Sequence, residues 1–158
     1  MPLVNAQSPI LTQQAGPDTN FPETYRAAFN HTAAAGVANE IRGSGSATIY
    51  ITKISVITSA STTITVDKLS ANSTGGTSAG LTETPLDSNN AAANGTVVEY
   101  TAAPTQGALV GAIGALTGTT VSYSFDTQPL TLNTAAQAVS ISVSSGVDVT
   151  GFVEWYEA

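Results

Sequence analysis

The sequence contains no cysteine among its 158 residues. A disulfide framework and a thiolate metal site are therefore excluded. Because small secreted domains commonly rely on disulfides, this absence favours assembly in a reducing cytoplasm. A chain of this length buries roughly two-thirds of its unfolded surface, so one domain can form a core without cross-links.

Charge is also scarce: only 9% of the residues are charged, and the formal net charge is −7. Soluble domains usually carry about 25% charged residues. Small neutral residues, chiefly Ala, Thr, Ser, Gly and Asn, take their place. Such a surface loses few hydrated ions when another protein covers it, so we expect much of it to be contact surface. The alternative is a free monomer kept soluble by its hydroxyl groups and negative charge.

The four basic residues, Arg26, Arg42, Lys53 and Lys68, form no cluster. Nucleic acids and anionic membranes both require a basic footprint, so we expect neither as a partner. No apolar run approaches the length of a membrane span. The first residues also lack the basic and apolar regions of a secretory signal, which predicts a protein made in the cytoplasm.

Residues that could carry chemistry are isolated from one another. His31 is the only histidine, and no Gly-x-Ser-x-Gly nucleophile motif accompanies it. Glu154 and Glu157 are three residues apart and therefore fall on opposite faces of a strand. Trp155 between them could form a sugar platform, but a core position is the favoured interpretation. Residues 87–90 resemble a calcium loop without its full pattern. We expect no enzyme, no cofactor and no metal.

Residues 1–22 are predicted to form an extended N-terminal arm, because four prolines interrupt any helix and no alternating pattern is present. The arm nevertheless carries five large apolar residues, Leu3, Val4, Ile10, Leu11 and Phe21. A solvated tail does not need them, so we predict that they form an interface with another protein. Local packing of the terminus is the alternative.

The remainder reads as eight to ten short strands with turn signals about every ten residues. The strongest signals are residues 48–58, with a bulge expected near Thr52-Lys53, and residues 62–69. We predict that these two segments form a hairpin through Ser59-Ala60-Ser61, and that residues 70–80 form a loop. Further strands are expected at residues 26–32, 81–86, 96–102, 109–116, 119–125, 129–132, 138–144 and 151–156, and one helical turn at 87–95. The apolar segment 109–116 reads as either a buried strand or an interface strand.

These patterns predict an all-β fold, an antiparallel β-sandwich or jelly roll with an extended N-terminal arm. Residues 1–22 are the arm, and residues 23–158 are a single domain.

Residues 69–111 resemble a family of small tailed-phage and prophage structural proteins. The matching elements are residues 72–78, 84–88, 91–93, 100–105 and Gly107. Residues 49–56, which follow Arg42-Gly43, and the closing segment 152–155 are also similar to that family. The resemblance covers about residues 40–158 and implies a β-sandwich and a structural role in the virion.

Two functions follow from the resemblance and the composition. The first is a capsid decoration, or cement, protein that clamps the head shell, with the major capsid protein or another virion protein as partner. We expect a homo-oligomer, with a trimer favoured. The alternative is a tail, baseplate or head-fibre component whose loops bind a host glycan. A hydrolase or lectin is disfavoured, because it needs converging carboxylates, a metal or an aromatic platform.

Overall fold

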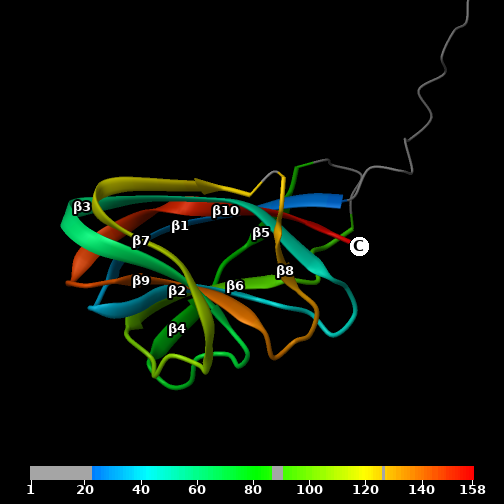
Figure 1. Cartoon of the computed structure of the whole chain (residues 1–158), viewed down its shortest axis with the longest axis horizontal. Helices are drawn as coiled ribbons and strands as arrows, with labels where there is room; N and C mark the ends of the chain where they lie inside the picture. Colours follow the sequence, from blue (N-terminus) through cyan, green and yellow to red (C-terminus); the bar gives the residue numbers. More distant parts are fainter. Residues whose placement is uncertain (1–22, 87–90, 126) are drawn as a thin grey trace, which may run out of the picture.

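The computed structural model describes residues 23–86, 91–125 and 127–158 (Figure 1). Every regular element in this part of the chain is a β-strand, and all strand pairs are antiparallel. The expected all-β antiparallel fold is therefore confirmed, whereas jelly-roll connectivity stays a prediction. The arm at residues 1–22 lies outside the described residues, as do its five apolar residues Leu3, Val4, Ile10, Leu11 and Phe21.

The ten strands join in one sheet. Their bounds are β1 Glu23–Ala33, β2 Gly36–Arg42, β3 Ile49–Leu69, β4 Thr77–Gly80, β5 Glu83–Pro85, β6 Thr96–Ala102, β7 Leu109–Ser124, β8 Leu130–Leu132, β9 Ala138–Val143 and β10 Val147–Glu157. The strand order is β4-β6-β2-β9-β3-β10-β1-β5, and β7 and β8 pair with the other side of β3.

Strand β3 folds this sheet into two layers. Its first half, residues 49–58, pairs with β10, and its second half, residues 64–69, pairs with β9. The bend between the halves therefore carries the chain from a layer containing β10, β1 and β5 to a layer containing β9, β2, β6 and β4. Figure 1 shows β3 turning this corner at the left of the view, with β7 turning beside it.

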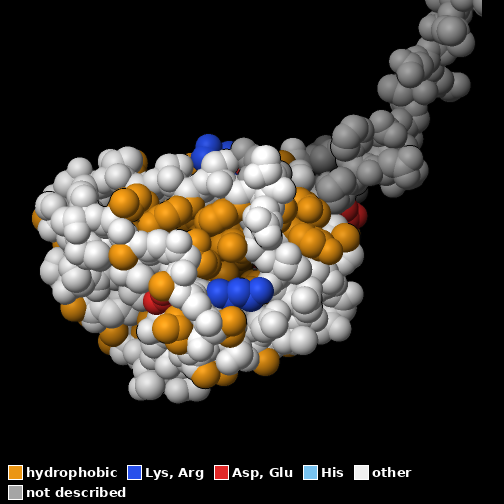
Figure 2. All heavy atoms as spheres, viewed as in Figure 1, with side chains coloured by type: hydrophobic (Ala, Val, Ile, Leu, Met, Phe, Trp, Pro, Cys, Tyr) orange, Lys and Arg blue, Asp and Glu red, His pale blue; other side chains and the backbone are white. Residues whose placement is uncertain are grey.

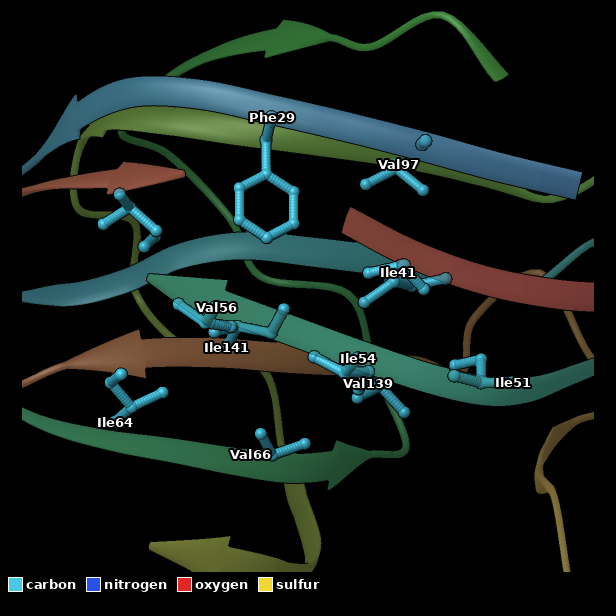
Figure 3. Close-up of a cluster of buried hydrophobic side chains, with 14 of the residues drawn as sticks. Phe29, Ile41, Ile51, Ile54, Val56, Ile64, Val66, Val97, Val139 and Ile141 are labelled. Atoms are coloured by element: carbon cyan, nitrogen blue, oxygen red, sulfur yellow. The ribbon is translucent and has the colours of Figure 1, made fainter. Parts of the chain in front are cut away.

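The space between the layers is filled by aliphatic side chains. Ile54 and Val56 come from the first half of β3, Ile64 and Val66 from its second half, and all four are fully buried. Figure 3 shows them with side chains from β1, β2, β6 and β9 around a common interior. Such β-branched residues suit a pleated surface that is covered on one face. Trp155 closes one end of the core and stacks on Tyr25 with ring centroids 5.8 Å apart.

The predicted hairpin between residues 48–58 and 62–69 is wrong. These residues form the single strand β3, and Ser59-Ala60-Ser61 is its corner rather than a turn. Both halves pair instead with β7, which also unites the predicted strands 109–116 and 119–125. The triplet contains neither glycine nor asparagine, the residues that the tight hairpin turns favour.

Other expectations have mixed outcomes. The bulge near Thr52 is confirmed, because the register against β10 shifts at that residue. The loop expected at residues 70–80 in fact ends in strand β4, and strand β2 was not expected. Of the predicted helical turn, residues 87–90 lie outside the described residues, and residues 91–95 form no helix. None of the described residues belongs to a helix that could cross a membrane.

Candidate functional site

The most exposed apolar side chains gather on one strand, β7. Five large hydrophobic residues are exposed in the described part of the chain, and three of them, Leu109, Val110 and Leu116, lie on β7. A fourth, Ile57, is the register partner of Thr120 on the same strand. The exposed fractions of Leu109 and Val110 are both 59%. Scattered exposed aliphatics are ordinary, but a cluster along one strand is typical of a contact surface.

Strand β7 also has an open edge. Its ladder partner is β3, and along residues 109–123 no second strand of the described chain pairs with the opposite side. Soluble proteins usually protect a long edge with charged residues, proline or very short length. Residues 100–125 contain no charged side chain, and β7 itself is 16 residues long without a proline. This edge is therefore available for pairing with another extended segment.

Two irregularities interrupt the first half of β7. The register against β3 shifts between Val66 and Asp67 and again between Lys68 and Leu69, which leaves Val110 and Ile113 as extra residues. Bulges of this kind bend an edge strand and raise its twist. Residues 114–118 keep a continuous register with β3, so they are the longest regular stretch before the corner.

Three residues of β7 are glycines, so no side chain projects from the strand at these positions. A side-chain carbon built on Gly111 would meet no atom within 4 Å, and one on Gly118 would meet only a single atom at 4.0 Å. The third glycine, Gly114, is covered by the ring of Tyr123, which returns from the other half of the bent strand. The open glycines let a partner backbone approach closely, whereas Gly114 makes room for the aromatic ring.

A hollow lies beside this strand, where the two layers separate. Its volume is about 530 Å³, and its lining comes from Lys68 and from the segment around Phe125 and Leu130. The Lys68 ammonium donates to the Thr131 carbonyl at 2.7 Å and so bridges the two layers. Figure 2 shows hydrophobic side chains gathered in the middle of this face, next to a cationic side chain. The lining of the hollow is more polar than apolar, so it forms a polar border to the exposed apolar side chains of β7.

A second surface is the outer face of the β1-β10-β3 layer. The rings of Tyr50 and Tyr156 stack with centroids 4.7 Å apart and planes at 10°. Phe152 lies beneath two cations, Arg26 at 4.6 Å and Lys53 at 5.5 Å from its centroid. The three aromatic side chains are only half-buried. Half of the basic residues of the chain therefore lie on one aromatic face, an arrangement that suits cation–π contacts.

The His31 side chain lies in the interior of the domain. Its side chain is only 5% exposed and points between the layers, where Nε2 lies 3.2 Å from the Ala38 carbonyl oxygen. The other nitrogen, Nδ1, lies 3.3 Å from Oε2 of Glu99, close enough for an ion pair but outside hydrogen-bond geometry. Nε2 therefore has an oxygen partner, whereas Nδ1 is buried without a hydrogen-bond partner.

One carboxylate, that of Glu99, faces His31. The described residues contain no group of three or more His, Cys, Asp or Glu that could hold a metal. Neighbouring Asn39 is fully buried, and neither atom of its amide has a hydrogen-bond partner. No sequence signal indicated this polar interior, because Glu99 is 60 residues beyond Asn39 in the chain and meets it only through the register of β2 and β6.

The C-terminal residues serve the core rather than a sugar platform. Trp155 is 1% exposed, and its Nε1 donates to Oε1 of Glu157 at 3.0 Å. The same carboxylate accepts from the backbone nitrogens of Asn94 and Gly95. Burial raises the pKa of Glu157, but these hydrogen bonds outweigh it and leave the pKa below its usual value. The platform interpretation is therefore wrong for Trp155, and Glu154 and Glu157 face opposite sides as expected.

Comparison with protein-family models, with curated proteins and with solved structures finds no match to this chain.

Proposed function

We propose that this chain is a structural component of a tailed-phage virion and that it acts as a capsid decoration, or cement, protein. In this role it stabilises the head shell through contacts made by its N-terminal arm and its open strand edge. It acts by covering surface and catalyses no reaction. Its partners are the major capsid protein or neighbouring virion proteins, and copies of itself.

The observation that carries the proposal is strand β7. It combines an edge that no other described strand pairs with, exposed Leu109, Val110 and Leu116, and a complete lack of charge. Left in water, such an edge invites pairing with any other extended chain. In a permanent assembly a neighbouring subunit covers such an edge, so the edge needs no charged or proline residues to protect it. Main-chain hydrogen bonds across the edge then strengthen the contact in addition to the apolar area that it buries.

The interior of the domain supports the same role. In the described part of the chain, the two layers pack against each other through a continuous apolar core. This core gives the arm a stable body from which to engage a neighbour. The resemblance of residues 69–111 to tailed-phage structural proteins agrees with a folded domain that carries a separate binding arm.

The test is the binding of the chain to purified head shells that lack it. Full-length protein should bind and should raise the temperature at which the shells release their contents. A variant lacking residues 1–20 should keep its circular dichroism spectrum and lose shell binding. Unchanged binding by this variant would contradict the arm mechanism. A cryo-EM map of particles from the encoding organism should place the density on the head, and density on the tail would overturn the decoration role.

A tail or fibre component with a glycan-binding role is the second candidate. The Tyr50, Tyr156 and Phe152 face is the observation that favours it, because aromatic rings stack on sugar rings. The aromatic groups lie on a strand face rather than in a loop, and Phe152 is already covered by Arg26 and Lys53. A glycan array with the full chain tests this candidate, with Tyr50→Ala as the variant that should abolish any signal.

A further inference from the structure

A partner that pairs with the whole open edge of β7 must bend where β7 bends. Its ladder with β3 passes from the pair Ile57 and Thr120 to the pair Thr62 and Gly118, where the sheet folds from one layer to the other. A second rigid domain could pair with only one of these halves, and the bulges at Val110 and Ile113 shorten the regular stretch further. A single extended segment can bend with the strand and pair with both halves.

The chain supplies such a segment in residues 1–22. Extended residues rise about 3.3 Å each, so the segment 3–16 spans roughly 45 Å, close to the length of β7. Neither the segment nor β7 carries a charged side chain, since Asp18 is the first charged residue of the sequence. Pairing the two therefore strips no side-chain ion of its water.

The prolines of the arm fit an outer strand. Pro9 and Pro17 are eight residues apart, an even number, so both ring nitrogens would lie on the same edge of an extended segment. Proline is tolerated in a strand when its nitrogen faces solvent. With both prolines facing outward, the alternate residues from Val4 to Gly16 turn toward β7, and none of them is a proline.

The direction of the chain favours a neighbour's arm over the molecule's own. Glu23, where β1 begins, lies in the same cross-sheet row as Glu157 and Ile49, and β7 runs toward that end of the sheet. An arm that folded back on its own molecule would therefore run parallel to β7. Parallel pairs are slightly less stable than antiparallel ones. An arm donated by another copy is free to run antiparallel.

We propose that residues 3–16 of one copy add as a strand to the open edge of β7 in the next copy. The contact is heterologous, because the donor surface differs from the acceptor surface. Heterologous contacts build a ring when the rotation between neighbours closes and a filament when it does not, and we propose the closed form. A three-membered ring agrees with the trimer favoured from the sequence. The inference rests on the proposed function only in treating β7 as a contact surface, and it names the partner of that surface as a second copy of this chain.

Sedimentation velocity of the full-length chain tests the contact in solution. Ile10→Asp with Leu11→Asp places charge in the donor, and Ala115→Lys places charge on the exposed acceptor strand. Each should raise the dissociation constant of the oligomer at least about tenfold. Two matched controls should leave the oligomer intact: Gln7→Glu with Gln13→Glu in the arm, and Ala28→Lys on the exposed face of β1, a strand that does not pair with β7.

Disulfide trapping identifies the donor, because the natural chain has no cysteine. Isotope-labelled Leu11→Cys chain is mixed with unlabelled Leu116→Cys chain and oxidised. Intact mass should show a disulfide between a labelled and an unlabelled chain. The doubly substituted chain should likewise cross-link into multimers.

Each contrary outcome is decisive. A wild-type monomer up to about 100 μM overturns the inference. An internal disulfide in the doubly substituted chain places the arm on its own β7, which also overturns it. An oligomer that is lost with Ala115→Lys but kept with the arm variant indicates edge-to-edge pairing instead. A ring that forms but does not bind shells contradicts only the proposed function.

Discussion

The ring of Tyr123 covers Gly114 on the same strand, so closely that a Cβ atom on residue 114 would lie 2.7 Å from the tyrosine hydroxyl oxygen. Strand β7 must bend to bring these two residues together. The contact locks the corner and leaves the hydroxyl buried with no hydrogen-bond partner. The pKa of Tyr123 is raised because burial disfavours the phenolate.

Tyr123→Phe should therefore be neutral or stabilising by up to about 1 kcal/mol, since it removes a buried oxygen that has no partner. Tyr100→Phe is the matched control. The Tyr100 hydroxyl accepts from Arg42 at 2.7 Å, so its loss should lower the free energy of unfolding by about 1–2 kcal/mol. Urea denaturation measures both. A larger loss for Tyr123→Phe than for Tyr100→Phe would show that its hydroxyl has a partner.

The interior pair of His31 and Glu99 should be energetically coupled. Nδ1 of His31 lies 3.3 Å from Oε2 of Glu99, so removing either side chain changes the surroundings of the other. A double-mutant cycle with His31→Gln and Glu99→Gln at neutral pH should give a coupling free energy above about 1 kcal/mol. The exposed pair of Arg26 and Glu154 is the control, where we expect less than about 1 kcal/mol. Equal coupling in the two cycles would contradict this prediction.

The sequence predicts the fold class well because strand periodicity is local. Strand β6 appears with the predicted bounds, and the Thr52 bulge was visible as a slip in the apolar alternation. Strand β2 was missed because its Asn39 and Glu40 are fully buried and break the alternation. Glu40 is held under the loop between β3 and β4, where its carboxylate accepts from the Ser73 nitrogen at 3.0 Å. The residues next to Glu40 in the sequence give no sign that a distant loop buries it.

The sequence predicts the contact surface on β7 only in part. Residues 109–116 read as either a buried or an interface strand, and the structure leaves Leu109 and Leu116 exposed. Whether residues 109–116 form a buried or an interface strand depends on which strand pairs with β3. Local sequence suggested that residues 62–69 return onto residues 48–58, whereas the actual partner β7 begins about 40 residues further on. Pairing over that distance is set by the whole sheet rather than by any turn signal.

Glu157 should make the protein sensitive to acid. Its folded-state pKa lies below the unfolded one, so its contribution is complete above the unfolded value and is lost as the pH falls through the folded value. Glu157→Gln should lower the free energy of unfolding at neutral pH by about 2–3 kcal/mol, because charged hydrogen bonds to Asn94 and Trp155 are lost. The variant should also lose less stability than the wild type on acidification. Urea titrations across the acid range measure this, and parallel profiles would contradict it.

Gly151 should be the least replaceable glycine in the sheet. It lies on β10 between Phe29 of β1 and Val56 of β3. A Cβ atom there would stand 2.0 Å from the Ser55 carbonyl oxygen and 2.8 Å from the Phe29 ring. The carbonyl belongs to the backbone of a central strand and cannot move aside without disturbing the ladder.

Gly151→Ala should therefore lower the free energy of unfolding by more than about 3 kcal/mol, at the upper end of overpacking effects. Gly80→Ala is the matched control, because β4 is an exposed strand and a Cβ on Gly80 meets nothing within 4 Å. That variant should stay within about 1 kcal/mol of the wild type. Thermal and urea unfolding of both variants measure the difference. A tolerated Gly151→Ala would mean that β10 and β3 lie further apart than their ladder of backbone hydrogen bonds allows.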